Sequence, residues 1–206
     1  QWNYATGLKL KRFRENGFWT FVLSRNMLNN HAVKYIDNDG SSEINLLYYY
    51  FSQESENKFR AENSIFKNGF TFNYGVNYKY TRYYIKNFDR STLASSGVVI
   101  NVESTSNFNL YGGFVSASKY FYDERMLISG GVRMDGADFG KTAENPLNQL
   151  SPRVSFSYQL KPNLFATANA GIYYQKPSYT VLGFKDNNGE LVNQLNDVRF
   201  IRNSQL

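Results

Sequence analysis

A stretch of strict alternation between two kinds of side chain most constrains what this chain can fold into. From 70 to 81 the sequence is Phe-Thr-Phe-Asn-Tyr-Gly-Val-Asn-Tyr-Lys-Tyr-Thr. Because successive side chains of a β-strand point to opposite faces, this stretch is predicted to be one strand with an apolar and a polar face. It is longer than the usual about 5 to 6 residues, and it suits the about 9 to 11 residues of a strand that crosses a bilayer.

The composition favours two-faced strands over membrane helices. Aromatic residues make up 17% of the chain, yet the mean hydropathy is −0.52, so apolar and polar residues are interleaved. The longest apolar block, 46–51, is far shorter than the about 18 apolar residues that indicate a membrane helix. The 206 residues are enough for one all-β domain, and no second domain is required.

Charge and cysteine content exclude several classes. The net charge of +6 comes from 23 basic and 17 acidic residues that are scattered along the chain, so no nucleic-acid partner is indicated. The absence of Cys excludes a disulfide framework and a thiolate metal site. The chain begins directly in strand-like sequence, and we expect either a removed leader or a start within a larger protein.

The alternation recurs in about eight segments. They are 4–13, 19–35, 46–66 with a possible interruption near Glu54, 70–81, 107–121, 125–135, 153–160 and 164–175. Short turns follow every odd segment, including the tight-turn pairs Asn16-Gly17 and Asn68-Gly69. Long connections follow every even one, and they are 37–42, 87–106, 136–150 and the end of the chain, where 185–206 is predicted to be a polar loop rather than a closing strand.

Alternating short and long connections are typical of bacterial outer-membrane barrels. The predicted fold is therefore an all-β, antiparallel up-and-down transmembrane β-barrel. In the 70–81 strand the apolar side chains should contact lipid and the polar ones should face the lumen. Both chain ends fall on the long-loop side, whereas complete barrels keep them in the periplasm, so we expect a barrel cut at both ends.

Two motifs resemble a known family. Gly131-Val-Arg-Met-Asp135 resembles the Gly-x-Arg-x-Asp strand of TonB-dependent outer-membrane receptors of a Bacteroidetes-like kind. The stretches 150–160 and 171–177 resemble the next descending strand, and the rising strand with its terminal Pro. The match is good over 120–184 and general elsewhere.

The resemblance implies that 1–206 is a partial barrel domain, with about eight strands of about 22 and no plug domain. It also implies a non-enzymatic receptor in the bacterial outer membrane, without a cofactor. The implied ligand is a scarce extracellular nutrient: a siderophore, cobalamin, a glycan or a peptide. The other implied partners are outer-membrane lipid and, through the rest of the receptor, the plug and TonB.

Two groups of side chains are candidate ligand-binding residues. Arg133, Asp135 and Arg153 should face the plug near the outer rim, or else form a solvated, mutually paired row on the lumen wall. Aromatic and polar residues at the loop side could touch ligand, although Tyr and Phe girdles occur on any membrane barrel; these residues are Tyr173, Tyr174, Gln175, Tyr179 and Phe184.

Three other motifs lack residues that their chemistry would require. The stretch 37–40, Asp-Asn-Asp-Gly, lacks the later bidentate Glu of a calcium loop, so we expect a plain turn. The stretch 140–142, Gly-Lys-Thr, lacks the earlier Gly of a phosphate loop, and no helix pattern follows it. His31 is the only histidine, and nothing orients it toward Ser24 as a catalytic dyad or toward other zinc ligands. We therefore expect no catalytic and no metal-binding residues.

Two alternatives stay open at this point. The first is a complete eight-stranded outer-membrane barrel that acts as an adhesin or a structural protein. The second is a soluble β-sandwich or β-barrel that binds glycans. A plug region upstream and further strands downstream in the full reading frame would separate the receptor from the small barrel, and solubility without detergent would identify the soluble module.

Overall fold

The computed structural model describes residues 1–90, 99–182 and 197–205. Within these ranges nine antiparallel strands form one sheet in sequence order. The strands are β1 (Trp2–Arg14), β2 (Gly17–Tyr35), β3 (Leu46–Lys67), β4 (Phe70–Asp89), β5 (Ile100–Phe121), β6 (Met126–Ala137), β7 (Ser151–Lys161), β8 (Leu164–Gln175) and β9 (Ile201–Gln205). The short helical segments are η1 (Ile36–Asn38), η2 (Glu43–Asn45), α2 (Lys141–Glu144), η3 (Pro146–Gln149) and α3 (Tyr179–Leu182). None of these helices is long and apolar enough to span a membrane.

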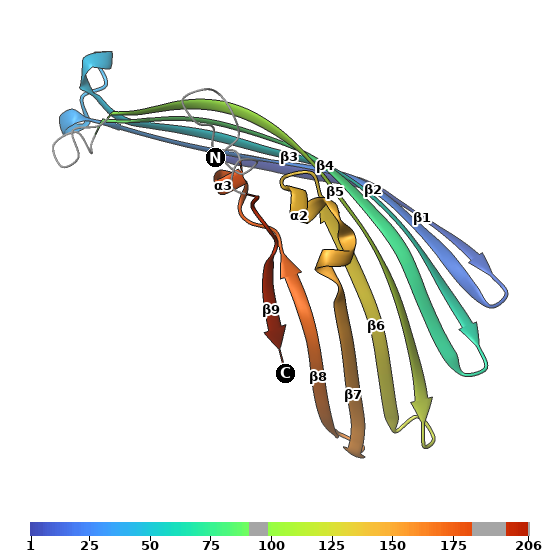
Figure 1. The fold of residues 1–206 in the computed structure, drawn as a ribbon. Coiled ribbons are helices and arrows are strands. Elements are labelled where there is room, and N and C mark those ends of the chain that lie inside the picture. Colours follow the sequence, from blue (N-terminus) through green and yellow to red (C-terminus); the bar gives the residue numbers. More distant parts are fainter. Residues whose placement is uncertain (91–98, 183–196, 206) are drawn as a thin grey trace.

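The sheet is a curved, open trough (Figure 1). The four short turns gather at one end, and α2, η3 and α3 lie on the concave side. In the described part of the chain β1 pairs only with β2, and β9 only with β8, so the sheet is not closed. The predicted up-and-down antiparallel class is confirmed, whereas a self-closed eight-stranded barrel is not what these residues form.

The hairpin of β3 and β4 shows why the register is well defined. Its ladder runs without a bulge from Lys67 opposite Phe70 to Tyr48 opposite Asp89. Asn68 and Gly69 form the turn with φ of 52° and 76°, and a two-residue turn of this kind needs positive φ at both positions. The tight turn predicted from Asn-Gly is therefore confirmed.

The two faces of β4 differ as the alternation predicts. The convex-face side chains are exposed, and the exposed fraction of Val76 is 56%. The concave-face residues Thr81 and Tyr83 are buried. We call the convex-face side chains of β4 from Phe70 to Tyr80, with their exposed apolar neighbours, the outer apolar belt; those neighbours include Leu8, Leu10, Leu23, Val115, Ile128 and Val154.

Several predicted boundaries were wrong. β4 extends to Asp89 and β5 begins at Ile100, so half of the predicted connection 87–106 is strand. β3 is continuous through Glu54, and β9 lies inside the predicted terminal loop. These segments are held by backbone pairing with a neighbouring strand, which needs no apolar alternation.

The buried hydrophobic cluster lies on the concave side of the sheet, where connections fold inward. Tyr83, Phe108 and Leu110 contribute from β4 and β5. Side chains of the β6–β7 and β8–β9 connections cover them; these are Phe139, Ala143, Tyr179 and Leu182, with Val198 and Phe200 packed alongside. The outer apolar belt is not part of this cluster, because it faces away from the protein.

Candidate functional site

Arg133 and Asp135 form an ion pair on the concave face of β6. The two nitrogens Nε and Nη2 of Arg133 each donate to one oxygen of Asp135, both over 2.6 Å. Nη2 also donates to Oδ1 of Asn77 over 3.1 Å. Gly112 lies opposite Asp135 on β5, and a larger side chain there would collide with the carboxylate. The two predicted residues are thus brought together and satisfy each other, as the paired-row alternative requires.

Arg153 and Tyr173 form a second unit, between β7 and β8. The guanidinium carbon of Arg153 lies 4.4 Å from the centroid of the Tyr173 ring, which is a cation–π contact. Within the described residues no carboxylate forms an ion pair with Arg153. Arg153 and Tyr173 line a hollow of about 600 Å³ together with Arg133, Arg60 and Asn169. Three of the six predicted site residues therefore share one concave surface.

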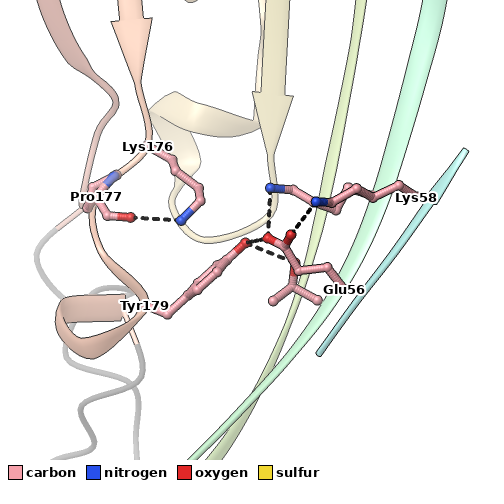
Figure 2. A network of polar contacts seen from close by, with 7 residues as sticks. Glu56, Lys58, Lys176, Pro177 and Tyr179 are labelled. Carbon is pink, nitrogen blue, oxygen red and sulfur yellow. Dashed lines mark hydrogen bonds and ion pairs between the residues drawn. The ribbon is translucent and has the colours of Figure 1, made fainter. Parts of the chain in front are cut away.

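Tyr179 belongs to a neighbouring network, which Figure 2 shows. Its hydroxyl donates to Oε1 of Glu56 over 2.7 Å and lies 3.0 Å from Oγ1 of Thr81. Glu56 is held in turn by Lys58 at 2.6 Å and by Lys79 at 3.1 Å. The segment after β8 is therefore attached to the inner wall at β3 and β4.

The Tyr179 ring reinforces this attachment. It stacks on Phe108 at 6.0 Å and on Tyr83 at 6.1 Å, and Tyr179 is only 4% exposed. Burial raises the pKa of Tyr179, with the Glu56 carboxylate adding to the effect, so the hydroxyl stays a hydrogen-bond donor. We call residues 176–182 the inward strap, because they cross from the end of β8 to the inner face of β3–β5.

Lys176 is a half-buried cation at the start of the inward strap. Its Nζ lies 3.4 Å from the centroid of the Tyr179 ring and contacts the carbonyl of Pro177 at 3.5 Å. Burial, with a smaller contribution from Lys79, lowers the pKa of Lys176. Within the described residues it has no ion-pair partner, and the ring of Tyr179 and the nearby carboxylates of Glu56 and Glu54 stabilise its charge.

A second link joins two of the long connections to each other. The backbone N and the hydroxyl of Thr142 donate to the two carboxylate oxygens of Asp197 over 2.8 and 2.6 Å. These bonds lower the pKa of Asp197. The β6–β7 and β8–β9 connections are therefore hydrogen-bonded to each other on the concave side of the sheet.

The six predicted residues do not form one site. Gln175 ends β8, is exposed, and takes no part in either unit. Tyr174 lies on the opposite face of β8 from Tyr173, and Phe184 lies outside the described residues. Sequence reasoning missed Glu56, although the alternation of 70–81 placed Lys79 on the polar face. No local signal could have found the contact of Glu56 with Tyr179, because 123 positions separate them.

Each of the three rejected motifs has a defined local structure. One carboxylate oxygen of Asp39 accepts from the backbone N of Ser41 and the other from the side chain of Asn45, which makes a turn. Contrary to expectation, a helix does follow Gly140, namely the four-residue α2. His31 packs on Tyr49 from the convex face of β2, whereas Ser24 faces the other way. Among the described residues no group of three or more His, Cys, Asp or Glu could hold a metal ion.

An up-and-down antiparallel sheet with an outer apolar belt and a charged inner face is the wall of a membrane β-barrel. The family model "TonB dependent receptor-like, beta-barrel" matches residues 1–202. The chain therefore belongs to this family, and the family predicted from 131–135 and 150–160 is confirmed.

The fold is similar to that of a solved structure. It is titled "Copper transporter OprC" and superposes with a TM-score of 0.66 at 17% sequence identity. The alignment covers 97% of this chain and 34% of that one, so the chain spans about a third of the length of that protein. No curated protein matches the sequence.

Proposed function

We propose that this chain forms part of the barrel wall of an outer-membrane receptor that imports a scarce nutrient with energy delivered through TonB. The observation that carries the proposal is the division of one sheet into an outer apolar belt and a charged, hollowed inner face, in a chain of this family. The nutrient classes we propose are siderophores, cobalamin, glycans and peptides. A plug domain and TonB would act through other parts of the receptor.

Arg153 and Tyr173 are the residues in this chain that we propose contact the ligand or the plug. Arg153 has a stacked aromatic ring beside it but no ion-paired carboxylate among the described residues, so its donors are available to a guest. Arg133 is less available, because Asp135 and Asn77 occupy its donors. A ligand with carboxylate or phosphate groups would complement Arg153 best.

Uptake by the intact receptor tests the proposal. Cells that lack the native gene would carry either the wild-type receptor or the Arg153→Ala variant, and uptake of labelled members of the four nutrient classes would be measured. We expect one class to be imported in a TonB-dependent way, and Arg153→Ala to reduce its apparent affinity about tenfold, the effect of one charge-assisted hydrogen bond. TonB-independent uptake, or none in any class, would refute the proposal.

A further inference from the structure

Two lysines flank one aromatic ring at the short-turn end of the convex face. Lys67 lies opposite Phe70 in the β3–β4 ladder, and Phe70 lies opposite Lys119 in the β4–β5 ladder. The three side chains therefore occupy one row across three strands, at the edge of the outer apolar belt nearest the short turns. Adjacent strands are about 4.8 Å apart, so the backbones of the two lysines are separated by about 10 Å. Two lysine side chains can close this distance around a single small anion.

The lysines have aromatic contacts but no acidic ones. Nζ of Lys119 lies 4.5 Å from the centroid of Phe70 and 5.5 Å from that of Phe121. Within the described part of the chain neither Lys67 nor Lys119 forms an ion pair. A hollow of about 300 Å³ lies at the same turn, and Lys67, Asn68 and Phe70 contribute to its lining. The row thus combines unpaired positive charge with space beside it.

The same charge pattern continues on the first hairpin. Arg14 lies at the corresponding end of β1, and its guanidinium carbon is 5.6 Å from the Trp19 ring. Arg12, two residues further into the strand, is exposed. Neither arginine forms an ion pair among the described residues. Unpaired cations therefore border the outer apolar belt on β1, β3 and β5, beside aromatic rings that face the same way.

The depth of these basic side chains in the bilayer indicates which partner they contact. The edge of an apolar belt lies where hydrocarbon gives way to head groups, and long basic side chains extend toward that boundary. Anionic lipids attract such side chains, at about 1 kcal/mol for each Lys or Arg near the surface. Phosphate groups are the anions present at this depth in every glycerophospholipid leaflet. The partner is therefore expected to be a lipid rather than a soluble ion.

We propose that Lys67 and Lys119, with Phe70 between them, form a binding site for the phosphate of an anionic glycerophospholipid in the leaflet next to the short turns. The ring of Phe70 packs against the part of an acyl chain next to the head group, and the two ammonium groups bind the phosphate. This proposal rests on the membrane location that is part of the proposed function.

Lipid selectivity of the intact receptor tests the site. The receptor would be refolded into phosphatidylcholine vesicles and into vesicles of equal parts phosphatidylcholine and phosphatidylglycerol. Spin-labelled lipids would report its preference for phosphatidylglycerol over phosphatidylcholine. The variants are Lys67→Gln, Lys119→Gln and the double change, with Lys67→Arg/Lys119→Arg as the conservative pair. Lys9→Gln is the matched control, because Lys9 lies on the concave face of β1 and carries the same charge.

We expect each single Gln change to reduce the preference at the occupied site about fivefold, which corresponds to the loss of one cation at the surface. The Arg pair should keep the preference, and Lys9→Gln should leave it unchanged. Wild-type preference in the double Gln variant, or an equal loss in Lys9→Gln, would overturn the lipid site while the proposed function stands. A receptor that inserts into neither kind of vesicle would overturn both.

Discussion

The most direct test of the sheet's two faces compares a charge at Val76 with the same charge at Asn77. Val76 is near the middle of the outer apolar belt and is 56% exposed on the convex face. Asn77 is the next residue, faces the concave side, and accepts from Arg133 over 3.1 Å. The two substitutions, Val76→Asp and Asn77→Asp, therefore place an identical carboxylate on opposite sides of one strand at the same depth.

The expected changes in the free energy of folding differ between the two variants in size and in sign. A lipid-facing Arg or Lys at the midplane costs about 2–4 kcal/mol and an acid somewhat less, so we expect about 2 kcal/mol for Val76→Asp. That is about a 30-fold loss in the folding equilibrium. Asn77→Asp replaces a neutral acceptor of Arg133 with a charged one, and such bonds are stronger by up to about 1 kcal/mol. It should be neutral or slightly stabilising.

The assay is refolding of the intact receptor into lipid vesicles, followed by urea titration and by heat-dependent migration on gels. Val76→Asp should lower the urea midpoint and the folded fraction, and Asn77→Asp should match the wild type. Equal tolerance of the two carboxylates would refute the assignment of convex face to lipid and concave face to lumen. Equal loss would show that both faces of β4 are buried in protein.

Two further outcomes are expected. Tyr179→Phe keeps the ring but removes the donor to Glu56, so the inward strap should lose about 1.5–3 kcal/mol of local stability; faster amide exchange in 178–182 would report it, and the same change in a Tyr174→Phe control would contradict the role of the hydroxyl. Gly69→Ala places a β-carbon at a φ of 76°, so the receptor should lose about 1 kcal/mol or more in urea titration, and an unchanged midpoint would show that the turn is not strained.

Alternation and turn chemistry were enough to predict most strands, because both are local. The side chains of 70–81 identify their own faces, and Asn68-Gly69 identifies its own turn. Local signals failed at 100–106 and at β9, where backbone pairing with an existing strand determines the structure. They failed more completely at the candidate site. The partner of Tyr179 is Glu56, and only the folded sheet brings such distant residues together.

The unbroken ladder between β3 and β4 has different surroundings before and after Tyr80. Up to Tyr80 the lipid side of β4 is apolar, so a slip of one residue would turn polar side chains into the bilayer. Beyond it, Arg82 and Lys86 interrupt the apolar pattern of that face, and about 30 Å of strand continues with Tyr83 and Ile85 buried on the concave side. A face that mixes charged and apolar side chains specifies its alignment only weakly. The outer apolar belt therefore also helps to fix the alignment of β4 beyond Tyr80, and one residue inserted between Phe70 and Tyr80 would misplace Thr81 relative to Glu56 and Tyr179 even though every side chain of that contact is still present.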